Sequence, residues 1–176
     1  MLLLEADGKF LFREAGIATP RGVRLRDAVA GAPLPGEGPW IAKAQVPVGG
    51  RGKAGGVRPV ASVAELPAVL GTLLALRIKG CEVGEVLVEE MSGGDEHYLA
   101  LMVDAGAGGV RLIYSPHGGV DVESHVPDAQ GVFNEVLPLD ASALEAAAVR
   151  LAGRVAPAWR DGLLEVCRRL IALFLE

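Results

Sequence analysis

The stretch Trp40-Ile-Ala-Lys-Ala-Gln-Val-Pro-Val-Gly-Gly-Arg-Gly-Lys-Ala-Gly-Gly56 joins an apolar segment to a loop with five glycines. Glycine lets a backbone adopt φ > 0 and approach a ligand closely, because it has no Cβ atom. Lys43 lies in the apolar segment, and Arg51 and Lys53 add two cations to the loop. Backbone amides and fixed cations together favour phosphate oxygens. The stretch therefore predicts a phosphate-binding loop, against the simpler alternative of a flexible loop kept soluble by its charges.

The apolar segment itself predicts a strand, in which successive side chains point to opposite faces. One face would carry Trp40, Ala42, Ala44 and Val46, and the other Ile41, Lys43 and Gln45. Lys43 would then point the same way as Gln45, toward whatever that face serves. The alternative for Lys43 is a surface lysine on a half-exposed strand.

The overall composition indicates a globular chain with a real hydrophobic core, because 51% of its 176 residues are apolar. Its 17 basic and 22 acidic residues give a net charge of −5, which argues against a nucleic-acid surface. No stretch reaches the roughly 18 apolar residues of a membrane span, and the start has no signal-peptide pattern. Cys81 and Cys167 stand far apart and predict buried free thiols. We expect a soluble, cytoplasmic protein.

The remaining pattern mixes helices and strands, which predicts an α/β or α+β fold. Ser62 with Glu65 and, later, Ser142 are candidate helix caps. Helices are expected at 3–15, 27–32, from 62, from 142 and from 161, and strands at 22–25, 57–60, 85–91, 96–103, 110–115 and 134–139. This order favours two lobes, 1–90 and 91–176, joined near 89–96.

The chain ends in a final helix that should place Leu163, Val166, Leu170 and Phe174 on one stripe. The consecutive apolar residues 170–175 should be covered, either by the domain or by a second copy of the chain, because an exposed patch of that kind favours association.

Lys43-Ala-Gln-Val and Gly49-Gly-Arg-Gly-Lys-Ala-Gly-Gly56 closely resemble the signature of the β subunit of succinate–CoA ligase, a member of the ATP-grasp superfamily. Other segments follow in the family's order: Gly16-Ile-Ala-Thr-Pro-Arg-Gly22, Leu87-Val-Glu-Glu90, Glu96-His-Tyr-Leu99 and Ser115-Pro-His-Gly-Gly-Val-Asp-Val-Glu123. The resemblance covers essentially the whole chain. It implies a two-lobed ATP-grasp domain with ATP between the lobes.

The resemblance also implies roles for individual residues. Lys43 resembles the lysine that reaches the nucleotide phosphates from a strand, a task that suits a point cation on rigid structure. Gly50, Arg51 and Gly52 resemble the loop that folds over the phosphates.

Two further parts of a nucleotide site are implied. The segment from Glu89 to Ser92 resembles the one whose backbone reads the adenine edge, so that its side chains would be incidental. Glu96 resembles the acid that accepts hydrogen bonds from the ribose hydroxyls; otherwise it is an exposed acid at a strand end. Asp121, Glu123 and His125 alternate as possible metal ligands, although a solvated polar edge is the favoured interpretation.

The family reaction converts a carboxylic acid, CoA and a nucleoside triphosphate to acyl-CoA, nucleoside diphosphate and phosphate, through a phosphohistidine on the partner α subunit. We therefore assign no catalytic role to His97, His117 or His125. The family's Mg²⁺ ligands, an Asn and an Asp on later strands, would follow Glu176. The resemblance thus implies a C-terminally truncated ATP-grasp domain that has no metal ligands of its own and turns over little alone.

Departures from the family pattern keep other interpretations open. Leu4-Glu-Ala-Asp7 replaces the family's His-Glu-Tyr-Gln, and His117 replaces an acidic residue. The main hypothesis is the nucleotide-binding part of an acid–CoA ligase that uses ATP, gives ADP and works with an α subunit. The alternatives are a non-catalytic module that binds a nucleotide or a partner protein, and a ligase for another acid such as malate. The sequence leaves ATP versus GTP open.

Overall fold

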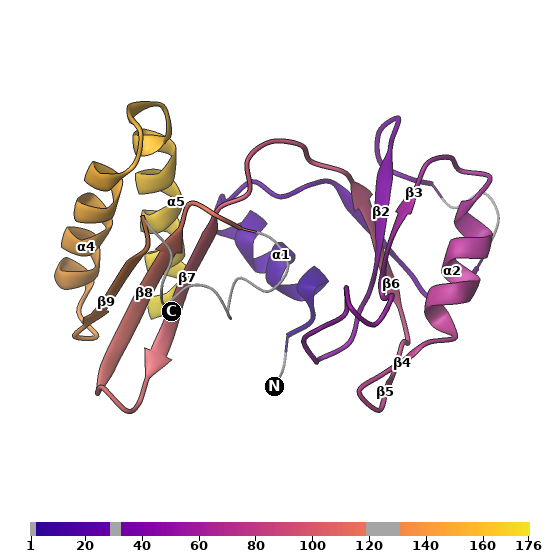
Figure 1. The fold of residues 1–176 in the computed structure, drawn as a ribbon, viewed down its shortest axis with the longest axis horizontal. Helices are drawn as coiled ribbons and strands as arrows, with labels where there is room; N and C mark the ends of the chain where they lie inside the picture. Colours follow the sequence, from indigo (N-terminus) through magenta and orange to yellow (C-terminus); the bar gives the residue numbers. More distant parts are fainter. Residues whose placement is uncertain (1–2, 29–32, 119–130) are drawn as a thin grey trace. The chain divides into compact units, whose positions relative to one another are not determined.

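The computed structural model describes residues 3–28, 33–118 and 131–176 (Figure 1). It contains two compact units: unit 1 comprises Met1–Arg13 and Ala18–Gly93, and unit 2 comprises Glu14–Ile17 and Gly94–Glu176. The candidate metal ligands Asp121, Glu123 and His125, and most of the short helix expected at 27–32, lie outside the described residues. The mixture of helices and strands confirms the expected fold class.

Unit 1 is built on a four-stranded antiparallel sheet in the order β1-β6-β2-β3. Its strands are β1 (Gly22–Leu25), β2 (Trp40–Ala44), β3 (Val57–Val60) and β6 (Val86–Glu90). The alternation expected along β2 is confirmed, because Trp40, Ala42 and Ala44 are buried while Ile41 and Lys43 are half-buried.

Helices cover the two faces of this sheet (Figure 1). The helix α2 (Leu66–Leu74) packs on the apolar face and buries Leu66, Leu70 and Leu73 completely. The helix α1 (Glu5–Glu14) lies on the opposite, polar face. Within α1, which the structure describes in full, only Ala6 is buried. Apolar packing therefore holds α2, whereas α1 has little of it.

The start of α2 differs from the expected capping box. The residue before the helix is Glu65, not Ser62, and it makes no side-chain cap. Its carboxylate instead accepts a hydrogen bond from the Ala61 N–H at 3.2 Å. Pro67 lies in the first turn, where its missing N–H costs no helical hydrogen bond. The sequence also did not predict the hairpin of β4 (Arg77–Ile78) and β5 (Cys81–Glu82), whose two-residue strands carry no readable alternation.

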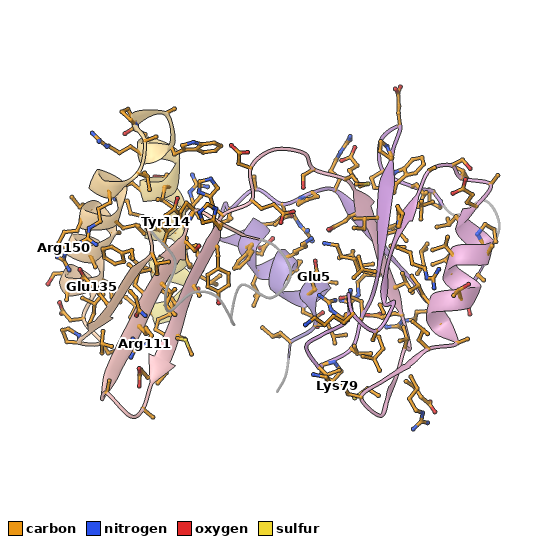
Figure 2. All side chains as sticks on the ribbon, viewed as in Figure 1. Glu5, Lys79, Arg111, Tyr114, Glu135 and Arg150 are labelled. Atoms are coloured by element: carbon orange, nitrogen blue, oxygen red, sulfur yellow. The ribbon has the colours of Figure 1, made fainter. Side chains whose placement is uncertain are left out.

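Unit 2 contains the antiparallel sheet β7-β8-β9, formed by Tyr98–Asp104, Gly109–Ser115 and Phe133–Leu137. The helix α4 (Ala141–Arg154) packs against β8 and β9, and α5 (Pro157–Leu175) packs against β7 and α4 (Figure 1). Arg150 of α4 and Glu135 of β9 form an ion pair at 2.5 Å, and both are labelled in Figure 2. No helix in the described ranges is long and apolar enough to cross a membrane.

The two helices of unit 2 correct three details of the sequence reading. Asp140, not Ser142, caps α4, because its carboxylate accepts a hydrogen bond from the Ala143 N–H at 2.9 Å. The helix α5 begins at Pro157 rather than Asp161, since proline suits a first helical turn. The buried residues of α5 are Cys167 and Ile171, each one position after an expected stripe residue, Val166 or Leu170. Val166 itself is 37% exposed.

The apolar end of α5 is covered in part. Ile171 is buried, and Phe174 packs against the core of unit 2, while Leu175 is 40% exposed. Both cysteines are free, as expected; Cys167 is buried and Cys81 is half-buried. Self-association through this end stays a prediction.

Candidate functional site

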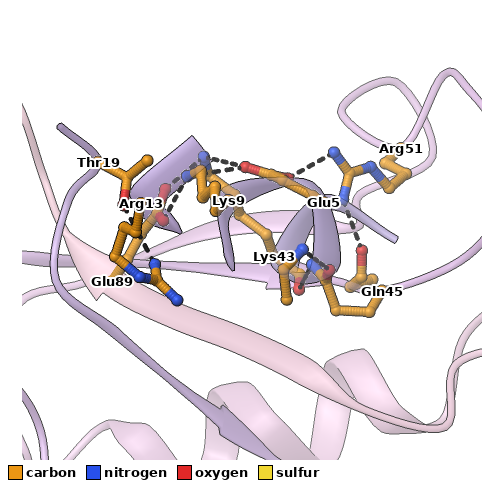
Figure 3. A network of polar contacts seen from close by, with 10 residues as sticks. Glu5, Lys9, Arg13, Thr19, Lys43, Gln45, Arg51 and Glu89 are labelled. Atoms are coloured by element: carbon orange, nitrogen blue, oxygen red, sulfur yellow. Dashed lines mark hydrogen bonds and ion pairs between the residues drawn. The ribbon is translucent and has the colours of Figure 1, made fainter. Parts of the chain in front are cut away.

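Lys43 lies on the polar face of β2 between two carboxylates (Figure 3). Its Nζ atom is 2.9 Å from Oε1 of Glu5 and 2.6 Å from Oε1 of Glu89. The β2 strand supplies the lysine, α1 supplies Glu5 and the central strand β6 supplies Glu89. A lysine that sequence alone left as a possible surface residue is therefore the centre of an ionic contact.

Arg51 shares the same carboxylate from the glycine loop. Its Nη2 atom is 2.6 Å from Oε2 of Glu5, and its Nη1 atom donates a hydrogen bond to the Ala44 carbonyl at 3.0 Å. Lys9, one turn along α1, lies 3.0 Å from Glu5 and also pairs with Glu89. We call these five residues the charged cluster: Glu5, Lys9, Lys43, Arg51 and Glu89. With three cations and two carboxylates, the cluster carries one positive charge in excess.

The cluster favours the charged forms of Glu5 and Lys43. Burial by itself would raise the pKa of Glu5, but the hydrogen bond and charge of Lys43, joined by Lys9 and Arg51, lower that pKa from 4.5 to about 2. Burial would lower the pKa of Lys43, but the hydrogen bonds and charges of Glu89 and Glu5 raise it above its ordinary value. The face of β2 thus presents fixed cations, which is what an anionic ligand requires.

The glycine loop is folded back on itself beside the cluster. Gly50 has φ +82°, and its carbonyl accepts a hydrogen bond from Ala54 N–H at 3.2 Å. Gly56 donates to the Arg51 carbonyl at 2.8 Å, and a Cβ at this position would lie 2.8 Å from a methyl group of Ile78. A side chain here would have to displace that methyl group and would also stand 3.1 Å from the Arg51 carbonyl.

Lys79 adds a cation at this loop that sequence reasoning missed. It stands between β4 and β5 (Figure 2), and a Cβ built on Gly50 would lie 3.6 Å from its Nζ atom. Nothing in the sequence links Lys79 to Gly50, because the contact depends on how the short hairpin folds.

The segment from Glu89 to Ser92 divides into two parts. Glu89 pairs with Gly22 of β1 on one side and Ile41 of β2 on the other, and its side chain is only 3% exposed. That side chain belongs to the charged cluster, so it is not incidental as the sequence suggested. Ser92 lies at the edge of an open hollow of about 550 Å³. The hollow is lined by Ala18, Thr19, Pro20, Gly38, Pro39, Glu90, Met91 and Ser92.

Glu96 belongs to unit 2 and is exposed, whereas the other six predicted site residues belong to unit 1. It lines an open hollow of about 440 Å³ with Asp95, His97, Pro116, His117 and Gly118. The Gly118 N–H donates to the Glu96 carbonyl at 2.6 Å, and a Cβ on Gly118 would lie 2.7 Å from the Glu96 backbone. This contact fixes the backbone of Glu96 and leaves its carboxylate accessible.

The structure therefore brings Lys43, Arg51 and Glu89 together and adds Glu5 and Lys9. Glu5 and Lys9 stand four residues apart on one face of α1, and this spacing was the one sign in the sequence that they form an ion pair. Phosphate oxygens could be held by Lys43, Arg51 and the loop amides. Within the described ranges, no group of three or more His, Cys, Asp or Glu residues could hold a metal ion.

Comparison with known proteins gives relatives that include succinate–CoA ligase subunits. The chain is 42% identical to the succinate–CoA ligase [ADP-forming] subunit β of Thioalkalivibrio sulfidiphilus, over 70% of this chain and 35% of the relative. It is 35% identical to the subunit of the same name from Acidithiobacillus ferrooxidans, over all of this chain and 51% of the relative. The chain thus spans at most about half the length of these relatives.

Two solved structures share the fold. A crystal structure of a protein from Pyrococcus horikoshii Ot3 matches with a TM-score of 0.69 and 17% identity, covering 97% of this chain and 76% of that one. The dinucleotide-forming acetyl-coenzyme A synthetase 1 of Ca. Korarchaeum cryptofilum, solved with coenzyme A and acetyl-coenzyme A, matches with a TM-score of 0.67 and 19% identity. That match covers 99% of this chain and 80% of the other.

The family comparison covers most of the chain. The profile described as "ATP-grasp domain" matches residues 2–148, a range that contains β1 to β9, the charged cluster, the glycine loop and Glu96. The match agrees with the fold shared with the two solved structures. This chain belongs to the ATP-grasp domain family.

Proposed function

We propose that this chain is the nucleotide-binding portion of an acid–CoA ligase that consumes ATP and releases ADP and phosphate, most like the β subunit of succinate–CoA ligase. The observation that carries the proposal is the carboxylate of Glu5, whose two oxygens contact Lys43 at 2.9 Å and Arg51 at 2.6 Å. Two cations next to a glycine loop thus already share one oxyanion. Phosphate oxygens have the same charge and similar hydrogen-bonding geometry.

In the proposal, each residue has a positioning role. Lys43 and Arg51 hold the polyphosphate, and the amides of Gly50 and Gly52 approach its oxygens. Positioning and charge compensation are the main contributions of a protein to phosphoryl transfer.

Two further contacts with the nucleotide are proposed from the family resemblance, each described within its own unit. The backbone at Glu89 to Ser92 would read the adenine, with Ser92 and Met91 next to the hollow of unit 1. Glu96, whose carboxylate is exposed in unit 2, would accept hydrogen bonds from the ribose hydroxyls.

Mg²⁺ is expected with ATP, and it would neutralise phosphate charge during transfer. Glu5 and Glu89 are each held by at least two cations, so we assign neither of them to the metal. Among the described residues we assign no ligand to the metal. Succinate as the acid and an α subunit as the partner are assigned by likeness to the relatives. Malate stays an alternative acid, and the partner's phosphohistidine is what the family resemblance implies. A cytoplasmic location stays a prediction.

A titration of ADP and ATP into the chain by calorimetry tests the proposal. We expect the wild type to bind and Lys43→Met, which keeps the length of the side chain without its charge, to lose binding. Arg150→Met is the matched control, because it removes a cation and an ion pair from α4 of unit 2. A folded wild type that binds neither nucleotide, or a Lys43→Met variant of unchanged affinity, would contradict the proposal.

A coupled assay with ATP, CoA and succinate separates the enzyme portion from a non-catalytic module. Since the chain spans about half of its relatives, we expect the chain alone to give little turnover. The same chain supplied with the remaining half of a relative's β subunit and with an α subunit should give turnover. A module would bind nucleotide and stay inactive in both cases.

A further inference from the structure

Glu5 is the most heavily shared anion of the charged cluster (Figure 3). One of its oxygens accepts from Lys43 at 2.9 Å and Lys9 at 3.0 Å, and the other accepts from Arg51 at 2.6 Å. Both cations that we assign to phosphates therefore already have an anionic partner. A phosphate oxygen that binds Lys43 Nζ and Arg51 Nη2 would therefore compete with this carboxylate for the same two groups.

The second carboxylate of the cluster is held far more firmly. Glu89 lies in the central strand β6, with strands paired on both sides, and its side chain is 3% exposed. Glu5 lies in the first turn of α1, and its side chain is 19% exposed. The helix that carries Glu5 buries only Ala6 and leaves Phe10 54% exposed. Glu5 is thus the carboxylate that can move away while the sheet stays intact.

We propose that Glu5 is an internal competitor of the nucleotide, which occupies the place of the phosphates and has to be displaced when the polyphosphate binds. This inference rests on the proposed function of Lys43 and Arg51. Glu5 would keep Lys43 and Arg51 ordered and partly neutralised without ligand, at the expense of nucleotide affinity. Glu5 influences the ligand in two ways: its charge repels phosphate oxygens, and its departure releases the side chains of Lys43 and Arg51.

The charge balance indicates which ligands succeed. With Glu5 in place, the cluster has one positive charge in excess, and once Glu5 has left it has two. A singly charged anion would only replace the single charge of the Glu5 carboxylate, so it gains little binding free energy. A diphosphate or triphosphate brings several charges and several oxygens to Lys43 and Arg51 at once. Glu5 therefore makes the site selective for polyphosphates over single carboxylates and other monoanions.

Calorimetric titration of ADP and of inorganic pyrophosphate into wild type and Glu5→Gln tests this inference. We expect Glu5→Gln to bind both ligands about tenfold more tightly, because the competing charge is gone. Asp7→Asn is the matched control: Asp7 lies on the same helix and pairs with Arg24 at 2.6 Å. It removes one carboxylate and one ion pair of α1 from outside the cluster, so it should lower the stability of α1 without changing affinity.

Each outcome decides the inference. Equal affinity of wild type and Glu5→Gln, with ADP still bound, overturns the inference and leaves the proposed function intact. Weaker binding by folded Glu5→Gln also overturns it, since Glu5 would then position the cations for the ligand. If neither folded chain binds ADP or pyrophosphate, the proposed function fails and takes the inference with it.

A second variant covers the case in which Glu5→Gln does not fold. Glu5→Asp keeps the charge but shortens the side chain by one methylene, so its carboxylate reaches Lys43 and Arg51 less well. We expect an intermediate gain in ADP affinity, about threefold. An Asp variant that binds as wild type does would count against displacement.

Discussion

Gly22 and Glu89 lie opposite each other where β1 pairs with β6, and a Cβ on Gly22 would stand 3.0 Å from the Cβ of Glu89. The carbonyl of Val88, 3.2 Å from the same point, belongs to the central strand and cannot give way easily. Gly22 thus leaves the room in which the buried side chain of Glu89 reaches Lys43. Gly22 is suited to this position because it has no side chain, and not because its backbone adopts a positive φ.

Gly22→Ala should therefore destabilise unit 1 and disturb the charged cluster. Overpacking of a fixed contact costs about 1–3 kcal/mol, and a displaced Glu89 would lose part of its 2.6 Å contact with Lys43. Urea unfolding followed by the fluorescence of buried Trp40, in a Trp159→Phe background, reports on unit 1. Gly8→Ala is the control, since a Cβ at Gly8 meets no atom within 4 Å. A Gly22→Ala variant as stable as wild type would show that the sheet relaxes at no cost.

The pKa of Glu5 predicts a defined acid sensitivity. Its folded value of about 2 lies below its ordinary 4.5, so the unfolded chain binds the proton more readily. The contribution of Glu5 to the free energy of unfolding is then complete above about pH 4.5 and disappears as the pH falls toward 2. At 1.36 kcal/mol for each pKa unit, this contribution is at most about 3 kcal/mol.

Glu5→Gln should remove this pH dependence. Unfolding of wild type and variant at neutral pH and near pH 3, followed by Trp40 fluorescence, should show a stability difference that shrinks in acid. Asp104→Asn supplies the comparison, because the pKa of Asp104 is lowered by hydrogen bonds from Ala107 and Arg111 in unit 2 and not by the cluster. A difference between wild type and Glu5→Gln that is the same at both pH values would contradict the ionic account of this contact.

Sequence reasoning succeeded where one segment decides the outcome. The alternation along β2 placed Lys43 on the polar face, and the period of the leucines placed Leu66, Leu70 and Leu73 in the core. These patterns are read from neighbouring residues and depend on one buried face. The glycine-rich segment forms a loop of turns, as its composition predicts, while its phosphate-binding role stays a prediction.

The partners of these residues could not be predicted in the same way. Glu5 and Lys43 are 38 residues apart, and Lys9 and Glu89 are 80 residues apart. Such pairs exist only once α1 lies on the sheet, and no local period records that arrangement. The side chain of Glu89 was overlooked because an acid within an apolar strand has no visible partner until β2 lies beside β6.

Asp140 and Ser142 give a direct test of the corrected helix cap. Asp140 accepts the Ala143 N–H at the start of α4, while Ser142 donates its hydroxyl to the Asp140 carboxylate at 2.5 Å. Asp140→Ala should lower the stability of unit 2 by about 1 kcal/mol, the usual cost of a lost cap. Ser142→Ala should cost clearly less. Urea unfolding followed by Trp159 fluorescence measures both, and the reverse ranking would restore Ser142 as the cap.

Cys167 should be chemically inert in the native chain, whereas Cys81 should react. Burial, with the nearby charge of Glu145, raises the pKa of the Cys167 thiol to about 11, so little thiolate exists at neutral pH. Cys81 lies in the short strand β5 and is half-buried. Because the thiolate is the reactive form, the burial of Cys167 and its raised pKa both slow its reaction.

Under native conditions, Ellman's reagent should react rapidly with about one thiol per chain of wild type and of Cys167→Ser. It should react with almost none in Cys81→Ser. In denaturant, both thiols of wild type should react at similar rates. Cys167→Ser should also lower stability, since it places a hydroxyl among the apolar residues between α4 and α5. Rapid native reaction of the Cys81→Ser variant would show that α5 opens readily and exposes Cys167, contrary to the packing of Ile171 and Phe174 beside it.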